Sequence, residues 1–399
     1  MNQEEIGRTL NRRLHNSFFR PTALQVTRDH SIHGHQPFRP LPAPAGTPPY
    51  HLALGDVLHG TAIGQITAAG KLVFHTVGDT GGVKTPLPQQ NVAHQMDHDL
   101  DVPDEAARPA FFYHLGDVVY FYGESEEYFP QFYEPYAPYQ APIFAIPGNH
   151  DGDLSPAMED AGVPSLAAFV DNFCQRIPHH SRDALDETRY TMTQPNVYWT
   201  LETPFATIIG LYTNVPEGGR LDNDQITWLQ LELQHAPTDR PLLVAMHHPI
   251  YSADEHHSGS VYMEQLFDEA IQVAGRVPDA VLAGHVHNYQ RFTRVITDRQ
   301  VPFLVAGGGG YHNLHRVSRD LKASGQQLPL QIPDVSNVTF EAYCDNRFGY
   351  LRLEVTPQSL KGDYFAVPGF GDPLETSASH IDSFVLDLAT HRVTTQPTS

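Results

Sequence analysis

Short apolar runs rich in β-branched and aromatic residues recur along the chain, and a polar cluster directly follows most of them. Continuous apolar runs of this kind are typical of strands that are buried on both faces of a sheet. The pattern predicts strands at 72–77, 111–115, 143–146, 206–212, 242–246, 280–283 and 303–306. We therefore expect an α/β sheet whose polar residues gather at the carboxyl edge of the strands, where such sheets bind their ligands.

Three segments between the strands carry helix signals. They are 165–177 after Pro164, 222–233 with Asp222 as a cap, and 260–273 with Ser260 as a cap and Gly275 as a stop. Beyond residue 340 the pattern changes to strands at 350–355, 362–367 and 381–388 with little helix between them. These late strands predict a second sheet that packs on the first within one domain.

Composition narrows the classes of function. The 399 residues include 25 basic and 46 acidic side chains, a net charge of −21, which argues against binding a nucleic acid through surplus positive charge. No apolar run is long enough to cross a bilayer, so we expect no membrane partner. Two cysteines, Cys174 in an expected helix and Cys344 in an expected strand, cannot form a disulfide framework. The 24 histidines, together with the many carboxylates, suggest metal chemistry.

Residues 1–48 differ from the rest of the chain. We expect them to form a Pro-, His- and Arg-containing extension, followed by one domain over 49–399. Arg12 and Arg13 resemble a twin-arginine export signal, but the segment after them breaks any apolar core. The expected location is therefore the cytoplasm, although a processed precursor of an exported protein would look the same.

The polar clusters after the strands form an ordered set of possible metal donors. The set comprises Asp79, Asp117, Tyr120, Asn149, His247, His285 and His287. A single Gly-Asp pair or a lone histidine would mean little, because the first is a common turn signal and the second is more often a structural or exposed side chain. Together the donors are too many for one ordinary ion and suit two. Asp117 would bridge the two ions, which would lie roughly 3.5–4 Å apart. If His285 and His287 lie in an extended segment, alternation places both rings on one side.

Five motifs carry a family resemblance. In chain order they are Gly78-Asp79-Thr80-Gly81-Gly82, Gly116-Asp117-Val118-Val119-Tyr120, Gly148-Asn149-His150-Asp151, His247-His248-Pro249 and Gly284-His285-Val286-His287. The sequence resembles the calcineurin-like metallophosphoesterases and, within them, the purple acid phosphatases. The resemblance covers 78–287 and implies two mixed β-sheets that pack face to face and are flanked by helices.

Gly81 and Tyr120 indicate the subfamily. Many metallophosphoesterases have a metal-binding histidine where Gly81 stands, and in purple acid phosphatases a tyrosine with the spacing of Tyr120 replaces it as a phenolate ligand. The alternative is that Tyr120 is only an aromatic residue beside Phe121 and Tyr122. The resemblance implies that Asp79, Asp117, Tyr120 and His287 hold Fe(III), and that Asp117, Asn149, His247 and His285 hold divalent Fe, Zn or Mn.

The implied activity is hydrolysis of phosphate monoesters, of the acid phosphatase type, by a metal-bound hydroxide. The partner is then a small phosphorylated substrate, with inorganic phosphate as product. Candidate proton donors are His150, His256 and His257, and the resemblance favours His256 over His257. Asp151 is expected to orient His150 or a ligand. Two alternatives remain: a dinuclear Mn or Zn phosphodiesterase on the same fold, and a catalytically silent binding protein.

Overall fold

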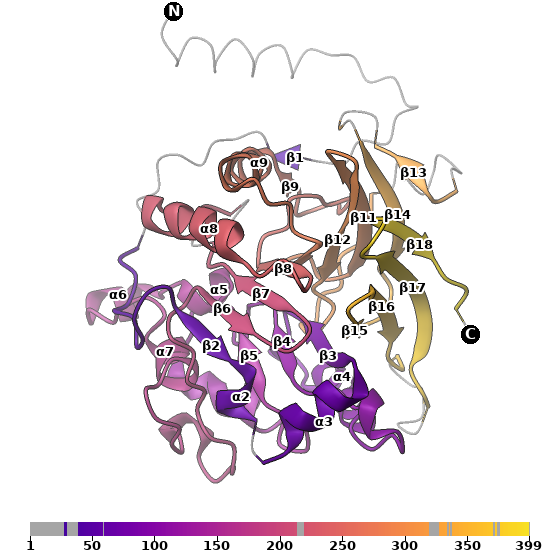
Figure 1. Cartoon of the computed structure of the whole chain (residues 1–399). Helices are drawn as coiled ribbons and strands as arrows, with labels where there is room; N and C mark the ends of the chain where they lie inside the picture. Colours follow the sequence, from indigo (N-terminus) through magenta and orange to yellow (C-terminus); the bar gives the residue numbers. More distant parts are fainter. Residues whose placement is uncertain are drawn as a thin grey trace, which may run out of the picture.

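The computed structural model describes residues 28–29, 39–58, 60–213, 219–318, 327–332, 335, 337–369, 372 and 376–398. Its strands form two large mixed sheets with flanking helices, which confirms the fold class that the sequence predicts (Figure 1). Most of the predicted N-terminal extension, including Arg12 and Arg13, lies outside the described residues. Among the described helices, none combines the length and the apolar character needed to cross a lipid bilayer.

The first large sheet has seven strands in the order β18-β17-β16-β15-β3-β4-β5. Its parallel part consists of β3 (Leu72–Val77), β4 (Phe112–His114) and β5 (Ile143–Ala145). Its antiparallel part consists of β15 (Gly349–Val355), β16 (Ser359–Ala366), β17 (Ser379–Asp387) and β18 (Arg392–Thr395). The two parts join where β15 pairs antiparallel with β3, with Leu353 opposite Phe74.

The second large sheet has nine strands in the order β13-β14-β11-β12-β10-β8-β7-β6-β2. Its parallel centre is β12 (Arg299–Ala306), β10 (Ala280–Ala283), β8 (Leu242–Met246) and β7 (Thr207–Gly210). Around it lie β13 (Leu330–Gln331), β14 (Val338–Cys344), β11 (Tyr289–Ile296), β6 (Trp199–Glu202) and β2 (His51–Ala53). A separate small sheet pairs β1 (Arg28–Asp29) with β9 (Gly259–Ser260).

The two large sheets pack face to face, and alternation along β8 shows how. Leu243 and Ala245 belong to the hydrophobic core between the sheets, together with residues such as Phe74 of β3. Val244 and Met246 belong to a different core, on the side of the helices. Successive side chains of a strand point to opposite faces, so a strand covered on both faces is apolar at every position.

Helices flank the two sheets. In Figure 1, α8 (Asn223–His235) and α9 (Val261–Ala274) lie toward the top, whereas α3 (Ala62–Ala69) and α4 (Leu87–His98) lie at the bottom. The remaining α-helices are α2 (Leu54–Val57), α5 (Asn149–Gly152), α6 (Pro156–Asp160) and α7 (Ala167–Phe173). The short η segments are η1 (Glu105–Ala107), η2 (Ser125–Glu127), η3 (Phe129–Tyr133) and η4 (Arg182–Ala184).

The predicted caps of α8 and α9 are confirmed. The side chain of Asp222 accepts a hydrogen bond from the backbone N–H of Gln225 at 2.8 Å, and Ser260 accepts one from Met263 at 3.1 Å. The helix expected over 165–177 is shorter. Leu166 precedes α7 in a left-handed backbone conformation. Cys174 lies after the end of the helix and forms an isolated antiparallel β-bridge with Thr193.

One expectation about the sheets is wrong. The site strands were expected in one sheet and the late strands in another, but β15 to β18 extend the sheet of β3, β4 and β5. The strands β8 and β10 belong to the other sheet. An apolar run shows that a strand is buried, but it does not show which strand pairs with it, because pairing depends on residues far away in the chain.

Candidate metal centre

Five loops bring the predicted donors together, and each loop leaves the carboxyl end of a strand. Asp79 follows β3, Asp117 and Tyr120 follow β4, Asn149 follows β5, His247 follows β8, and His285 and His287 follow β10. The site is therefore built from both large sheets. All seven side chains are buried, with at most 7% of any of these residues exposed.

Asp117, Asn149, His247 and His285 form one group. Atoms of Asp117, His247 and His285 that could bind an ion all lie within 4.8 Å of one another. The amide oxygen of Asn149 lies 3.1 Å from His247 Nε2 and 3.0 Å from His285 Nδ1. His247 Nε2 also lies 3.4 Å from Asp117 Oδ2.

Asp79, Tyr120 and His287 form a second group. Asp79 Oδ1 lies 3.4 Å from the Tyr120 hydroxyl and 3.5 Å from His287 Nε2. The other carboxylate oxygen of Asp79 accepts the backbone N–H of His285 at 2.8 Å. This bond ties the loop after β3 to the loop after β10.

In two histidines, the hydrogen bond made by Nδ1 indicates which role Nε2 has in the neutral ring. His247 Nδ1 donates to the carbonyl of Leu115 at 2.8 Å, and His287 Nδ1 donates to the carbonyl of Asn313 at 2.9 Å. In a neutral imidazole the Nε2 atom is then an acceptor, and in both residues it faces a carboxylate oxygen, also an acceptor. Acceptors that converge in a buried space require a positive charge between them. A proton on His247 can supply it in the metal-free protein, and a metal ion suits the whole donor set.

The backbone is strained at three of the predicted ligands. Asp79, Asp117 and His285 have φ values of 58°, 53° and 66°. Non-glycine residues rarely adopt this left-handed region, and where they do so the surrounding structure has to hold them there. His285 is therefore not in the extended segment that the sequence suggests, and a bend over 285–288 brings both imidazoles to the site.

Gly81 leaves the space that the Tyr120 ring occupies. A Cβ atom at residue 81 would lie 2.6 Å from Tyr120 Cδ2, and it would also overlap Gln131 Oε1. A histidine at 81 and this position of the tyrosine therefore exclude each other. The backbone of Tyr120 is held by Gln131, whose side chain accepts its N–H at 2.9 Å and donates to its carbonyl at 3.0 Å.

The pKa shifts in the site favour a cation. Burial acts to lower the pKa of His247, but the Asp117 carboxylate outweighs burial and raises this pKa to about 9. Burial acts to raise the pKa of Asp117, but His247 and His150 hold it below its usual range. Burial, followed by Asp117 and Asp79, raises the pKa of Tyr120 well above its usual range. A phenolate at residue 120 therefore needs a highly charged cation beside it.

Asp151 holds the loops of the site rather than the ring of His150. Its carboxylate accepts the backbone N–H groups of Gly148 at 2.8 Å, Val118 at 3.1 Å and Val119 at 3.3 Å. These bonds join the loop that carries Asp117 and Tyr120 to the loop that carries Asn149. Of the two expected roles, the structure favours orientation of the ligand loops.

The candidate proton donors lie in different places. His150 has its backbone N–H on Asp117 Oδ1 at 2.9 Å and its Nδ1 2.9 Å from the carbonyl of Phe121. The ring of His257 lies 4.6 Å from that of His285, centroid to centroid. His256 is exposed, and its ring contacts His315 at 5.6 Å. His257 therefore lies nearer to a predicted ligand than His256, which the resemblance favours, and the identity of the proton donor stays a prediction.

The sequence analysis missed His315. This residue is buried, its backbone N–H donates to the carbonyl of His287 at 3.0 Å, and its ring lies 4.3 Å from the ring of His287. His315 lies on the loop after β12 and belongs to none of the five motifs. The other histidines near it in the sequence are the signal that could have indicated it. His248 is also buried, and its Nδ1 lies 2.5 Å from the Thr213 hydroxyl.

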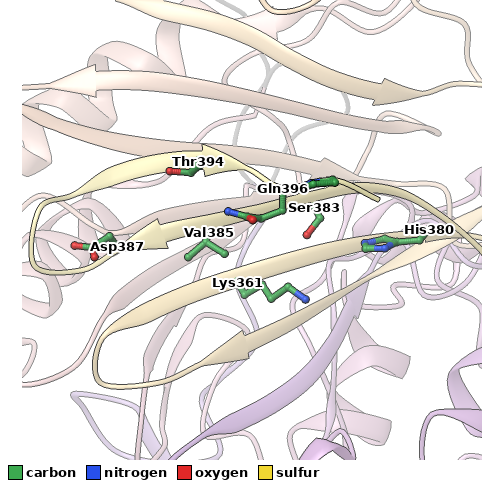
Figure 2. Close-up of a pocket in the computed structure, with 8 residues that line it drawn as sticks. Lys361, His380, Ser383, Val385, Asp387, Thr394 and Gln396 are labelled. Atoms are coloured by element: carbon green, nitrogen blue, oxygen red, sulfur yellow. The ribbon is translucent and has the colours of Figure 1, made fainter. Parts of the chain in front are cut away.

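A cavity of about 590 Å³ lies elsewhere, on the strands β16 to β18 (Figure 2). Lys361, His380, Ser383, Val385, Asp387, Thr394, Gln396 and Pro397 line it. Three of these side chains contact the carboxylate of Asp363. The distances to its oxygens are 2.8 Å from Lys361, 3.0 Å from His380 and 2.7 Å from Ser383. No predicted site residue lines the cavity, and its main charges are balanced within the sheet.

Comparisons with known proteins agree with the geometry of the candidate metal centre. Residues 74–289, more than half of the chain, match the family model of the calcineurin-like phosphoesterases. The chain is 27% identical over 247 residues to purple acid phosphatase 22 of Arabidopsis thaliana, a match covering 59% of this chain and 50% of that protein. It is 28% identical over 200 residues to Fe(3+)-Zn(2+) purple acid phosphatase 12 of the same plant, covering 45% and 38%.

The fold has a counterpart among solved structures. A purple acid phosphatase from yellow lupin (Lupinus luteus) seeds superimposes with a TM-score of 0.54 at 15% identity, over 79% of this chain and 54% of that chain. At this identity the likeness shows the fold alone. The chain spans about half the length of the first curated relative that it matches.

Proposed function

Because this chain belongs to the calcineurin-like phosphoesterase family, we propose that it is a metal-dependent phosphomonoesterase of the purple acid phosphatase type. The observation that carries the proposal is the convergence of buried acceptors from five loops. Carboxylate, amide, phenol and imidazole groups meet at this site and are buried. In the described ion pairs of these residues, no partner is a Lys or an Arg. Two metal ions would supply the missing positive charge.

The donors divide into two sets that share Asp117. Asp79, Asp117, Tyr120 and His287 would hold the first ion, and Asp117, Asn149, His247 and His285 would hold the second. Iron(III) is proposed at the first position because Tyr120 would supply a phenolate, a hard anionic donor that a trivalent ion favours. When bound, such ions neutralise charge on phosphate oxygens and acidify water.

The reaction consumes one water. Its oxygen forms a bond to phosphorus, the bond from phosphorus to the ester oxygen breaks, and that oxygen takes up a proton to leave as an alcohol. We propose His150 and His257 as the donors of this proton. The carbonyl of Phe121 holds Nδ1 of His150, so Nε2 points to the opposite side of the ring, where a charged imidazole can donate.

His257 is held by a carboxylate beneath it. Asp254 Oδ1 accepts the backbone N–H groups of His257 at 2.7 Å and His256 at 2.8 Å. This arrangement fixes the turn and leaves the ring of His257 against those of His285 and His315. We assign His257 the role of binding phosphate or protonating the leaving oxygen, with His150 as the second candidate for the proton.

The test is elemental analysis and a visible spectrum of the purified protein, together with parallel assays on p-nitrophenyl phosphate and bis(p-nitrophenyl) phosphate. We expect two metals per chain, one of them iron, a charge-transfer band, and faster hydrolysis of the monoester. A colourless Mn or Zn protein that prefers the diester would establish a phosphodiesterase instead. Negligible turnover with both metals bound would establish a binding protein.

A further inference from the structure

A pair of histidines on α4 has no role in the chemistry described above. His94 and His98 stand four residues apart on this helix, and both are exposed. Residues with this spacing lie one above the other on the same face of a helix. The two rings are in contact, with centroids 4.2 Å apart and planes inclined by 58°. We call His94 and His98 the α4 histidine pair.

Buried side chains of α4 fix the helix to the protein. Val92, Ala93 and Met96 belong to the hydrophobic core. The end of the helix is held as well, because the carboxylate of Asp99, directly after α4, lies 2.9 Å from Nε2 of the buried His75. The histidine pair is therefore carried by an anchored helix, and such an element positions ligands more precisely than a loop does.

The surroundings of the pair favour a cation. Asp97 lies between the two histidines in the sequence, and Asp101 follows His98 by three residues. Burial, followed by the charge of Asp101, raises the pKa of Asp97, whereas His98 and His94 act to lower it. The two carboxylates and the two imidazoles thus lie close enough to influence one another. The pair also stands at the carboxyl end of a 12-residue helix, where the helix dipole attracts positive charge.

The donor atoms indicate which cations the pair can bind. Two histidines spaced by four residues on one face of a helix can both bind the same zinc ion. Imidazole suits Zn²⁺, Cu²⁺ and Ni²⁺, whereas Mg²⁺ and Ca²⁺ prefer oxygen ligands. Among the described residues, the set of three close His or carboxylate donors is the one at the candidate metal centre. At α4 the ion would therefore be held by the two imidazoles, and water would complete its coordination.

We infer that the α4 histidine pair is a further metal site, which binds one Zn²⁺ or a chemically similar transition-metal ion in addition to the ions of the candidate metal centre. The site lies on a different element from the loops that carry the predicted catalytic ligands, and it requires neither a substrate nor the proposed activity. A bound ion connects two successive turns of α4. It thereby stabilises the last turn of the helix, next to the contact between Asp99 and His75.

Calorimetric titration with Zn²⁺ tests the site. The protein is first incubated with iron and zinc salts so that the candidate metal centre is filled, and loosely bound metal is removed by dialysis. We expect the parent to bind one further Zn²⁺, with the same affinity when Mg²⁺ is present in excess. His94→Gln and His98→Gln should each weaken this binding by about 10-fold or more, because one of the two bonds from imidazole is lost.

His235→Gln is the matched control. His235 is also an exposed histidine in the last turn of a helix, α8, but four residues before it stands Leu231 instead of a second histidine. This variant removes one surface imidazole without changing the pair, so the further Zn²⁺ should bind with the affinity of the parent.

Hydrogen exchange locates the ion. Zn²⁺ should slow the exchange of backbone amides over residues 94–101 severalfold in the parent and in His235→Gln, because the ion connects successive turns of the helix. The same addition should leave exchange over these residues unchanged in His98→Gln.

The outcomes separate this inference from the proposed function. Equal Zn²⁺ affinity in the parent and in both variants of the pair overturns the inference, and so does the absence of a further Zn²⁺ in the parent. Displacement of the further ion by Mg²⁺ also overturns it, since oxygen ligands would then hold the ion. A protein that binds Zn²⁺ at α4 but hydrolyses no phosphate ester would contradict the proposed function and support the inference.

Discussion

Two buried polar clusters in this protein differ in where their balancing charge comes from. In the first, Arg291 of β11 binds Asp382 of β17 through two hydrogen bonds, at 2.7 Å from Nε and 2.9 Å from Nη2. Tyr289 donates to the same carboxylate at 2.7 Å. In the second, the candidate metal centre, the carboxylates of Asp117 and Asp79 face imidazole nitrogens of His247 and His287, at 3.4 Å and 3.5 Å.

The difference separates a structural cluster from a functional one. Arg291 and Asp382 connect the two large sheets and neutralise each other, so that cluster is complete without a ligand. Burial acts against the charge on Arg291, yet the hydrogen bonds to Asp382 outweigh it and raise the pKa of Arg291. In the described ion pairs of Asp79 and Asp117 the partners are histidines and not Lys or Arg, and we propose that bound cations would balance this second cluster. Variants of each cluster should therefore affect different properties of the protein.

The largest effect is expected from Asp117→Asn. This change removes the charge of the carboxylate shared by both sets of donors, while asparagine still tolerates the left-handed backbone at 117. We expect both metals to be lost and kcat/KM for a monoester to fall by about 10³-fold or more, measured by elemental analysis and steady-state kinetics.

The metal-free form of Asp117→Asn provides the control. Its free energy of unfolding should fall by about 1–3 kcal/mol relative to the metal-free parent, because asparagine no longer balances the charge of buried His247, whose pKa Asp117 helps to raise to about 9. Full metal content in this variant would contradict the shared role of Asp117.

Asp382→Ala should have the opposite profile. Removing one member of a buried ion pair leaves Arg291 charged and buried, which costs about 3–5 kcal/mol of unfolding free energy. Urea denaturation measures this loss, and metal content should be unchanged. The double variant Arg291→Met with Asp382→Leu should recover much of the stability, and failure to recover any would show that the pair does more than balance charge.

Tyr120→Phe tests a single donor. We expect the visible charge-transfer band to disappear and iron retention to fall, as seen by absorption spectroscopy and metal analysis. Stability of the metal-free protein should change by less than about 1 kcal/mol, because the hydroxyl makes only a 3.4 Å contact with Asp79. A variant that keeps both its colour and its iron would show that the phenol is not a ligand.

The smallest effect concerns a third polar group, at the edge of the nine-stranded sheet. His51 of β2 lies 2.8 Å from Glu232 of α8 and 3.0 Å from Glu202 of β6. The hydrogen bond to Glu232 raises the pKa of His51, against a lowering by partial burial. A raised pKa stabilises the folded protein below the unfolded pKa near 6.5, and this stability is lost as pH rises through the folded value.

Solvent screening keeps the contribution of His51 below about 1 kcal/mol. Unfolding free energies of the parent and of His51→Gln, measured at about pH 5.5 and about pH 8.5, should differ more at the lower pH. An equal difference at both pH values would mean that His51 does not titrate between them in the folded state.

Much of the local structure could be predicted from the sequence. The strands over 72–77, 242–246 and 280–283 have the predicted bounds, and Asp222 and Ser260 cap their helices. These features depend on neighbouring residues: a buried run, or a side-chain oxygen that reaches an N–H three residues ahead. The donors of the candidate site could be identified for the same reason, because each lies within a few residues of the end of an apolar run.

Features that depend on distant segments could not be predicted. The sequence suggests that Gly307 to Gly310 with Tyr311 and His312 approach the site, and Tyr311 does donate its N–H to Asp79, but the contact of His315 with His287 follows from no motif. The left-handed backbone at His285 replaces the expected extended segment, because Asp79 binds its N–H from another loop. Each of these outcomes needs contacts between segments that are far apart in the chain.

The order of side chains along short stretches predicts the strands that lead into the candidate site and the polar groups at their carboxyl ends, but it does not predict β6, β11 or β14. Only the tertiary structure decided that β3, β4 and β5 stand in one sheet with the late strands while β8 and β10 stand in the other. Strand pairing is settled by packing across the whole molecule, and the same packing places the donors of two sheets around a common point.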